Sequence, residues 1–182
     1  MTDVVDLILQ DHRELQRMFE ELQSDPSKRR ALAPVMSTLL FAHSRAEESE
    51  VYPGARAAGG EEDVEHSQEE HLLADKLLAK LADTDPASPE FDSALTELVE
   101  AVSHHVEEEE SKVLPGLRRL SADRRAELAE AFLASRAEHL GDQPGDIRKS
   151  ELDQQAANIG LDGASAKSKD ELAQELSSRA EE

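Results

Sequence analysis

One motif occurs twice in this 182-residue chain, and it contains a histidine and a glutamate four positions apart. Both copies read His-x-x-x-Glu-Glu-Ser-x-Val-x-Pro-Gly-x-Arg, the first at residues 43–56 and the second at residues 105–118, an offset of 62 residues from 43 to 105. The segments before them also correspond, because an Asp-His pair at residues 11–12 aligns with a Glu-His pair at residues 70–71. The duplication predicts two similar helical hairpins that pack into a bundle with pseudo-twofold symmetry.

The apolar residues recur at alternating intervals of three and four, which is the spacing of a helix that packs into a bundle. This stripe passes through His12 near the N-terminus and through His105 and Glu109 in the second motif copy. Ionisable side chains therefore fall on the seams that should face the core. Capping residues, glycines and prolines mark the helix ends, with interruptions expected near Pro34 and Pro53. We predict helices over about residues 3–24, 28–57, 61–81, 89–116 and 122–140.

These elements predict an all-α protein built on an antiparallel up-down four-helix bundle with a short fifth helix. The bundle would occupy residues 1–140, and the glycines and proline of residues 141–147 predict a linker. Residues 148–182 read as helix, glycine-containing turn, Ser-Lys cap and helix, which predicts a small helical or partly disordered appendage. Aromatic residues make up only 3% of the chain, which favours helices over a β-sandwich core.

The charge of the chain restricts its partners. The formal net charge is −21 at pH 7, so approach to a nucleic-acid backbone or an anionic membrane would begin with repulsion. We expect neither as a partner, whereas cation binding is favoured. There is no cysteine, which excludes a disulfide framework and a thiolate zinc site. Acidic residues stand near the N-terminus where a signal peptide needs basic ones, so we predict a cytoplasmic location.

Residues four apart lie on one face of a helix, so each motif copy can direct an imidazole and a carboxylate at the same centre. Two further histidines would come from the other two helices. The six candidate metal ligands are His12, His43, Glu47, His71, His105 and Glu109. Carboxylates can bridge two metal ions while imidazoles complete the coordination, and this donor set suits iron or manganese. The alternative is that each histidine is a hydrogen-bonded core residue and each glutamate a flanking, solvated charge. An ionised glutamate on a bundle seam would cost several kcal/mol if it were unpaired, and a cation removes that cost.

These residues resemble the hemerythrin-like HHE cation-binding family over about residues 3–118. The resemblance implies a four-helix bundle with two iron ions joined by an oxo or hydroxo bridge, and iron is preferred to manganese. Carried over by motif, the ligands of one iron would be His12 and His43, those of the other His71 and His105, and the bridging carboxylates Glu47 and Glu109.

The chain departs from oxygen-carrying hemerythrins on its third helix. Those proteins have a His-x-x-x-His pair there, whereas this chain has Ser67 four residues before His71. The fifth imidazole is therefore missing, and His66 is a poor substitute because it lies about 140° around the helix. We interpret the chain as a four-histidine member of the family, for which simple reversible oxygen carriage is disfavoured.

Tyr52 stands where the second motif copy has Leu114. A phenolate there could complete the coordination of an iron, and the alternative is an ordinary aromatic residue at the end of the bundle. His104 and His139 are expected outside the ligand set, at the surface or beside the site.

The resemblance predicts that the protein reacts with or senses oxygen, peroxide or nitric oxide, a role connected with oxidative stress. Decomposition of peroxide or another oxygen-dependent reaction would make it an enzyme. The alternative is an iron-handling or regulatory module that signals to a protein partner through its C-terminal tail, without catalytic turnover. That tail resembles the small nucleic-acid-binding module at the N-terminus of the Rho termination factor. Residues 146–182 nevertheless hold five Lys or Arg against nine Asp or Glu, which favours a protein contact.

Overall fold

The computed structural model describes residues 2–180. Met1, Glu181 and Glu182, which belong to the predicted bundle and tail, lie outside the described residues. The helices within residues 2–180 are α1 (Val4–Ser24), α2 (Arg29–Ala46), α3 (Tyr52–Ala57), α4 (Glu61–Ala82), α5 (Pro89–Leu117), α6 (Ala122–His139), α7 (Lys149–Asn158) and α8 (Lys169–Arg179). A π-helical segment, Glu47–Val51, joins α2 to α3, and short 3₁₀ turns cover Pro26–Lys28, Pro144–Asp146 and Ala164–Ala166.

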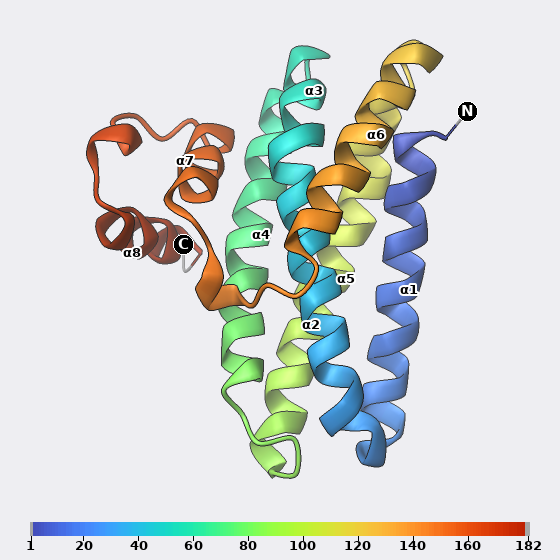
Figure 1. The fold of residues 1–182 in the computed structure, drawn as a ribbon, viewed down its shortest axis with the longest axis vertical. Coiled ribbons are helices and arrows are strands. Elements are labelled where there is room, and N and C mark those ends of the chain that lie inside the picture. The colour runs from blue at the N-terminus through green and yellow to red at the C-terminus, as the bar shows by residue number, and fades with distance from the viewer. Residues whose placement is uncertain (1, 181–182) are drawn as a thin grey trace.

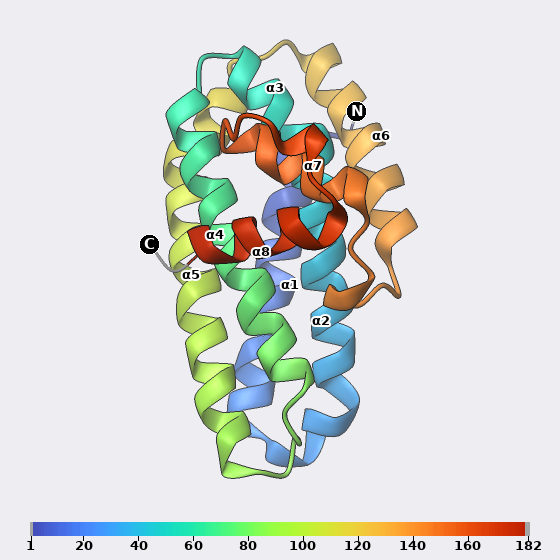
Figure 2. The ribbon, with the colours of Figure 1, turned by 90° about the vertical axis from the view of Figure 1, so that its left-hand side faces the viewer.

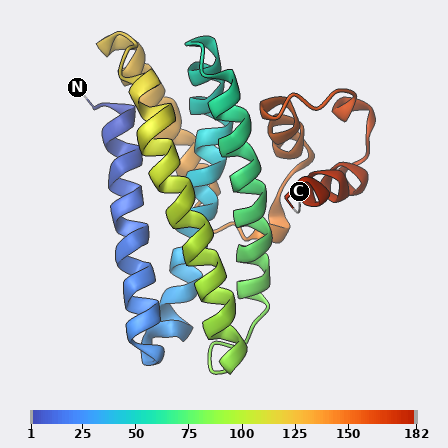
Figure 3. The same ribbon diagram turned by 180° about the vertical axis from the view of Figure 1, so that it is seen from behind.

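Four long helices, α1, α2, α4 and α5, form the antiparallel up-down bundle (Figure 1). Neighbours along the chain pack together, and the bundle closes through contacts of α1 with α5 and of α2 with α4. Seen from behind, α1, α5 and α4 make one face with α2 beyond them (Figure 3). The predicted fifth helix is α6, which packs against α1 and α2. The all-α prediction is confirmed, and no helix among the described residues is both long and apolar enough to cross a membrane.

Local sequence explains where the helices begin. The Asp3 side chain accepts a hydrogen bond from the Val5 backbone N–H at 3.0 Å and so caps α1. Pro89 opens α5, where its missing N–H costs nothing. A kink or break was expected near Pro34; the break is wrong, because this residue lies inside a continuous α2. It removes only one backbone donor close to the start of the helix.

The helix that carries the first motif copy changes its hydrogen bonding within the motif. Glu47–Val51 is π-helical, and the Tyr52 N–H donates to the Glu47 carbonyl, five residues earlier. The change immediately precedes Pro53, which has no N–H to continue the α-helical pattern. In the second copy α5 passes through Pro115 as an α-helix. The two copies therefore share a sequence pattern but differ in backbone conformation.

A layer of ionisable side chains divides the bundle core into two apolar clusters. Along α1, Ile8 belongs to one cluster and Leu15 to the other, with His12 between them. Along α5, Val113 and Val106 belong to the same two clusters. Burial of each large apolar side chain contributes about 1.5–3 kcal/mol, so a polar layer across the core gives up stability that something else must restore.

The tail packs back onto the bundle. Both α7 and α8 lie against α4, and α7 also contacts the π-helical segment (Figure 2). Leu72 of α4 shares a buried cluster with Leu152 and Leu172 of the tail. Ser168 caps α8 as the sequence predicts, since its hydroxyl accepts from the Glu171 N–H at 3.3 Å. The described part of the tail is therefore helical and has no apolar core separate from the bundle.

Candidate metal centre

The six predicted ligands lie at one level of the bundle. Helices α1, α2, α4 and α5 each contribute one histidine, and the two glutamates follow one turn after the histidines of α2 and α5. The six side chains, none more than 6% exposed, are His12, His43, Glu47, His71, His105 and Glu109. The structure thus brings together on four helices the residues that the repeated motif singles out.

One group of ligand atoms lies between α1 and α2. Atoms of His12, His43 and Glu47 are all within 4.8 Å of one another. The Nε2 atom of His43 is 3.2 Å from Oε2 of Glu47, and Nε2 of His12 is 3.3 Å from Oε2 of Glu109. Metal–ligand bonds of about 2.0–2.2 Å place neighbouring ligand atoms about 3–4 Å apart, which these distances match.

The second group lies on the opposite side of the layer. Atoms of Glu47, His71 and His105 are again within 4.8 Å of one another. The Nε2 atoms of the two histidines are 3.0 Å apart, and that of His71 is 3.5 Å from Oε2 of Glu47. Glu47 belongs to both groups, which is the position of a bridging carboxylate. The grouping is the one that the family resemblance implies, and the ligation itself stays a prediction.

Each of the four histidines is held from behind by a carboxylate of a neighbouring helix. The Nδ1–carboxylate pairs are His43–Asp11 (3.3 Å), His71–Glu48 (3.1 Å), His105–Glu70 (2.9 Å) and His12–Glu110 (3.1 Å). Every helix thereby supports the histidine of the next one, and the pairs close a ring that obeys the symmetry of the repeat. A carboxylate on Nδ1 fixes the ring and leaves Nε2 to face a metal.

Sequence reasoning missed these four carboxylates, although a signal was present. Each stands directly beside a predicted ligand in the sequence, as in Asp11-His12 and Glu47-Glu48. Successive residues of a helix point about 100° apart, so the ligand faces the core while its neighbour faces the adjacent helix. A carboxylate next to a predicted ligand therefore predicts a support for a histidine of the adjacent helix.

Several inward-facing atoms of the layer have no hydrogen-bond partner among the described residues. The Nε2 atoms of His12 and His43 and both carboxylate oxygens of Glu47 and Glu109 are buried and make no hydrogen bond. Buried polar atoms are rarely left in this state, because their lost hydration is not replaced. A cation among them would satisfy both carboxylates and both imidazoles. The residues present therefore fit a bound metal.

The electrostatics of the layer also favour positive charge. Burial raises the pKa of Glu47, and the nearby Glu109 carboxylate raises it further. Burial would raise the pKa of Glu109 as well, but the imidazoles of His12, His105 and His43 together outweigh it and lower that pKa to about 2. Burial would lower the pKa of His43, yet the carboxylates of Glu47 and Asp11 raise it to about 10. The layer thus holds positive charge between its carboxylates, which a divalent cation can supply.

Tyr52 reaches the same layer from the end of the π-helical segment. It is fully buried, and its hydroxyl oxygen lies 3.2 Å from Nε2 of His71. Burial and the carboxylates of Glu109 and Glu47 raise its pKa well above the ordinary value. The equivalent Leu114 lies in an apolar cluster. Tyr52 is positioned beside the candidate ligands, and its role as a ligand stays a prediction.

The other three histidines lie elsewhere. The side chains of His66 and His104 are 50% and 64% exposed on α4 and α5. A surface position is wrong for His139, which is only 4% exposed at the end of α6. Its ring packs edge-on against Phe41 with centroids 6.3 Å apart, and Nδ1 lies 3.2 Å from a carboxylate oxygen of Asp142. The linker after α6 folds back and covers the His139 ring. The burial of His139 therefore depends on where the tail packs on the bundle.

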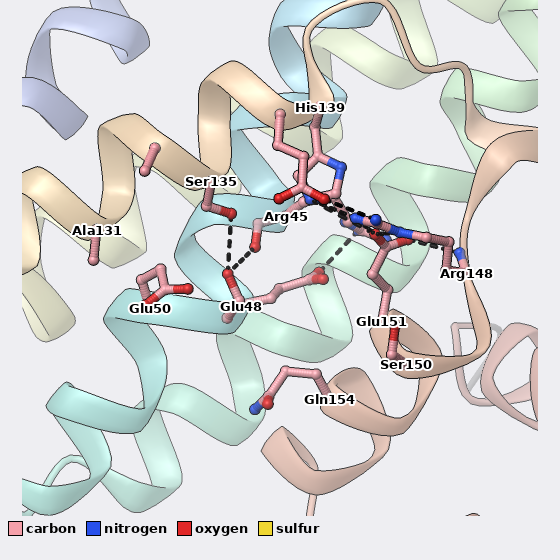
Figure 4. Close-up of a pocket in the computed structure, with 13 residues that line it drawn as sticks. Arg45, Glu48, Glu50, Ala131, Ser135, His139, Arg148, Ser150, Glu151 and Gln154 are labelled. Atoms are coloured by element: carbon pink, nitrogen blue, oxygen red, sulfur yellow. Dashed lines mark hydrogen bonds and ion pairs between the residues drawn. The ribbon is translucent and has the colours of Figure 1, made fainter.

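A pocket of about 430 Å³ lies between α6, α7 and the π-helical segment, with Arg45 and Glu48 in its wall (Figure 4). The buried Arg45 guanidinium donates to Glu48 at 2.9 Å and to Asp75 at 2.7 Å. From α7, Gln155 donates to the same Glu48 carboxylate at 3.3 Å, and Asn158 donates to its backbone carbonyl at 3.0 Å. Tail side chains therefore contact the residue that orients the α4 histidine.

A buried layer of imidazoles and carboxylates across a four-helix bundle defines a helical cation-binding protein. The hemerythrin HHE cation-binding domain matches residues 3–117, and the chain belongs to this family. The family predicted from the repeated motif is thereby confirmed. The match ends before the tail, so the resemblance of residues 148–182 to the N-terminal module of the Rho termination factor stays a prediction.

Two curated relatives cover most of the chain. It is 31% identical over 147 residues to a protein described as a DNA nickase from Nostoc sp., an alignment that covers 78% of this chain and 42% of that protein. It is 33% identical over 140 residues to an uncharacterised hemerythrin-like protein from Schizosaccharomyces pombe, covering 72% of this chain and 68% of the relative. The chain thus spans less than half the length of the Nostoc protein. No solved structure matches it.

Proposed function

We propose that this is a non-haem di-iron protein that reacts with or senses oxygen, peroxide or nitric oxide. The observation that carries the proposal is the set of inward-facing imidazole nitrogens and carboxylate oxygens that have no hydrogen-bond partner. Membership of a cation-binding family supports a bound metal. A donor set of imidazoles and carboxylates without thiolates favours iron, with manganese as the second choice.

The proposed ligands of one iron are His12 and His43, those of the other His71 and His105, and the bridging carboxylates Glu47 and Glu109. Two iron ions joined by an oxo or hydroxo bridge would supply redox chemistry toward a small ligand. The chain itself orients each imidazole through the carboxylate on its Nδ1 atom. The apolar clusters on both sides of the layer keep bulk water away from it.

The number of ligands bears on the kind of reaction. Six protein ligands leave positions free on a metal pair for a small molecule. With four histidines, we propose chemical reaction or sensing in preference to simple reversible oxygen carriage. The Tyr52 hydroxyl, next to His71, is placed either to join the coordination or to donate a hydrogen bond to the small ligand.

Absorption spectroscopy of the purified protein, before and after hydrogen peroxide is added, tests this proposal. We expect near-ultraviolet bands that depend on iron, change with peroxide and recover as peroxide is consumed. His71→Ala should abolish them because it removes a ligand, whereas Glu62→Ala, which changes an exposed residue on the same helix, is the control and should retain them. The proposal would be contradicted if the absorption spectrum of the iron-loaded protein did not change on addition of peroxide, oxygen or nitric oxide.

DNA cleavage, the activity named for the Nostoc relative, is not part of the proposal. The net charge of −21 opposes approach to a phosphate backbone, and the alignment covers only 42% of that relative. The same charge opposes docking on anionic membranes. The chain has no cysteine, so no disulfide bond favours an oxidising compartment. We propose a cytoplasmic location.

A second candidate function is iron-dependent regulation that is passed to a protein partner through the tail. It is favoured by the contacts of Gln155 and Asn158 with Glu48, whose carboxylate lies 3.1 Å from Nδ1 of His71. A change at the His71 side of the metal layer would alter the surface on which α7 rests. The tail would then report the state of the centre without catalytic turnover.

Amide hydrogen exchange with and without iron distinguishes this second candidate. If the tail reports the centre, the amides of α7 should exchange more slowly in the iron-loaded protein, because the Glu48 contacts are then held in place. The first two turns of α5, which are remote from the layer in sequence, provide an internal reference. Identical exchange of α7 in both states would exclude the regulatory proposal while leaving the di-iron proposal intact.

A further inference from the structure

Outside the metal layer, a second pair of His-x-x-x-Glu sequences meets on the surface of the bundle. His66 and Glu70 lie on α4, and His104 and Glu108 lie on α5. Each pair is four residues apart and so shares one face of its helix. Because α4 and α5 are antiparallel neighbours, the two faces come together (Figure 3). From the sequence, His66 is a poor substitute for the missing fifth imidazole, and His104 is expected at the surface or beside the buried site.

The four side chains converge at short distances. Nε2 of His66 lies 2.8 Å from Oε2 of Glu108 and 3.6 Å from Oε1 of Glu70. Nε2 of His104 lies 3.6 Å from the same Glu70 oxygen. These two carboxylate oxygens are shielded from solvent and accept no hydrogen bond. Both imidazoles are at least half exposed, so the cluster is open to ions from solution.

We propose that this cluster, which we name the outer site (His66, Glu70, His104 and Glu108), binds one divalent transition-metal ion. Two imidazole nitrogens and two carboxylate oxygens suit Zn²⁺ as four ligands, and Fe²⁺ or Mn²⁺ with added water. Lys112 already pairs with Glu108, but its Nζ lies 2.8 Å from Oε1 and leaves Oε2 facing the histidines. Ligand atoms of His66, Glu70 and Glu108 lie within 4.8 Å of one another, close enough for a single ion. His104 lies outside this group and approaches it through Glu70, at 3.6 Å, as the proposed fourth ligand.

The symmetry of the repeat gives an independent reason to expect a cation there. Glu70 corresponds to Asp11 in the first half, and each supports a histidine through Nδ1. The other oxygen of Asp11 accepts from the guanidinium of Arg136 at 2.9 Å. Within residues 2–180, the other oxygen of Glu70 forms no ion pair with a guanidinium and faces two imidazoles instead. A metal ion at the outer site would occupy the electrostatic position that the guanidinium fills in the first half.

Calorimetric titration of the full-length protein with Zn²⁺ tests the outer site, with the iron content measured beforehand. The wild-type protein should bind one more Zn²⁺ per chain than the His66→Ala/His104→Ala variant. Both histidines are exposed, so this variant should keep the fold, which circular dichroism can verify. Glu65→Ala/Glu107→Ala removes two exposed carboxylates beside the cluster and is the matched control. It should retain the additional ion.

His71→Ala keeps this test separate from the proposed function. That variant should still bind the ion at the outer site, whatever it loses from the buried layer. Equal Zn²⁺ stoichiometry in the wild type and the double-histidine variant would overturn the outer site. Loss of the ion in the Glu65→Ala/Glu107→Ala control would overturn it too, because general surface charge would then explain the binding.

Discussion

The two copies of the motif build equivalent halves of one layer of candidate metal ligands in very different surroundings. Glu48 and Glu110 occupy the same motif position, and each orients a histidine of the other hairpin. Glu48 is 2% exposed and lies under α7 in a network of buried donors. The Glu110 side chain is 25% exposed, and its second partner is the exposed Arg13 at 2.8 Å. The same task is performed in a buried and in a solvated environment.

The difference shows that the residues shared by both motif copies form the layer of candidate ligands. The motif positions that differ between the copies determine which groups surround that layer. Arg45 stands where the second copy has the exposed Glu107, and its guanidinium allows Glu48 to be buried. Tyr52 stands where the second copy has Leu114 and brings a hydroxyl to one side only. The tail packs on the π-helical segment of the first copy and on α4 of the second hairpin, so Glu48 is covered and Glu110 is not (Figure 2).

The largest expected effect is a difference in stability between variants of Glu48 and Glu110. Glu48→Ala leaves the Arg45 guanidinium buried with Asp75 as its remaining carboxylate partner, and should lower the free energy of unfolding by about 3–5 kcal/mol. Glu110→Ala removes a partly exposed partner and should cost about 1 kcal/mol or less. Urea unfolding of both variants at matched iron content measures the difference. Equal losses of unfolding free energy in the two variants would show that burial of Glu48 under α7 does not strengthen its contribution to stability.

A smaller effect is expected where the tail meets Glu48. Gln155→Ala removes hydrogen bonds to Glu48 and Asp75 and should lower the free energy of unfolding by about 1–3 kcal/mol. Gln174→Ala, an exposed position on α8, is the control and should stay within about 0.5 kcal/mol of wild type. If thermal unfolding ranks the two variants equally, the α7 contact does not stabilise the first half.

Tyr52→Phe sharpens the comparison spectroscopically. The change keeps the buried ring and removes the hydroxyl beside His71, so the free energy of unfolding should change by about 1 kcal/mol or less. If the phenolate binds iron, the visible phenolate-to-iron absorption should disappear. Leu114→Met, a swap of similar volume at the equivalent position, should leave the spectrum unchanged. A spectrum that survives Tyr52→Phe would assign Tyr52 to packing and hydrogen bonding alone.

The smallest effect belongs to the exposed pair of the second half. Arg13→Ala removes the ion pair with Glu110 and should change the free energy of unfolding by less than about 1 kcal/mol, with a smaller change in high salt. Unfolding measured at low and high ionic strength checks this. A loss as large as that of Glu48→Ala would mean that the two environments are energetically alike.

The fold and the inner layer could be predicted because both follow from periodicity along single helices. His43 and Glu47 share a face by spacing alone, and the repeat supplies their counterparts. The contacts between elements could not be predicted in this way. Which carboxylate supports which imidazole depends on the packing of neighbouring helices, and the burial of His139 depends on where the tail docks. The π-helical turn at Glu47–Val51 also depends on that environment, because Pro115 in the second copy causes no such change.

The measurement that tests the central claim most directly is the iron content of the purified protein, read together with its unfolding temperature before and after chelation. We predict about two iron ions per chain, lost in His71→Ala, and a clear fall in the unfolding temperature when they are removed, because the buried carboxylates then lose their counter-charge. A protein that binds no metal when iron is supplied, and unfolds at the same temperature with or without a chelator, would contradict the claim.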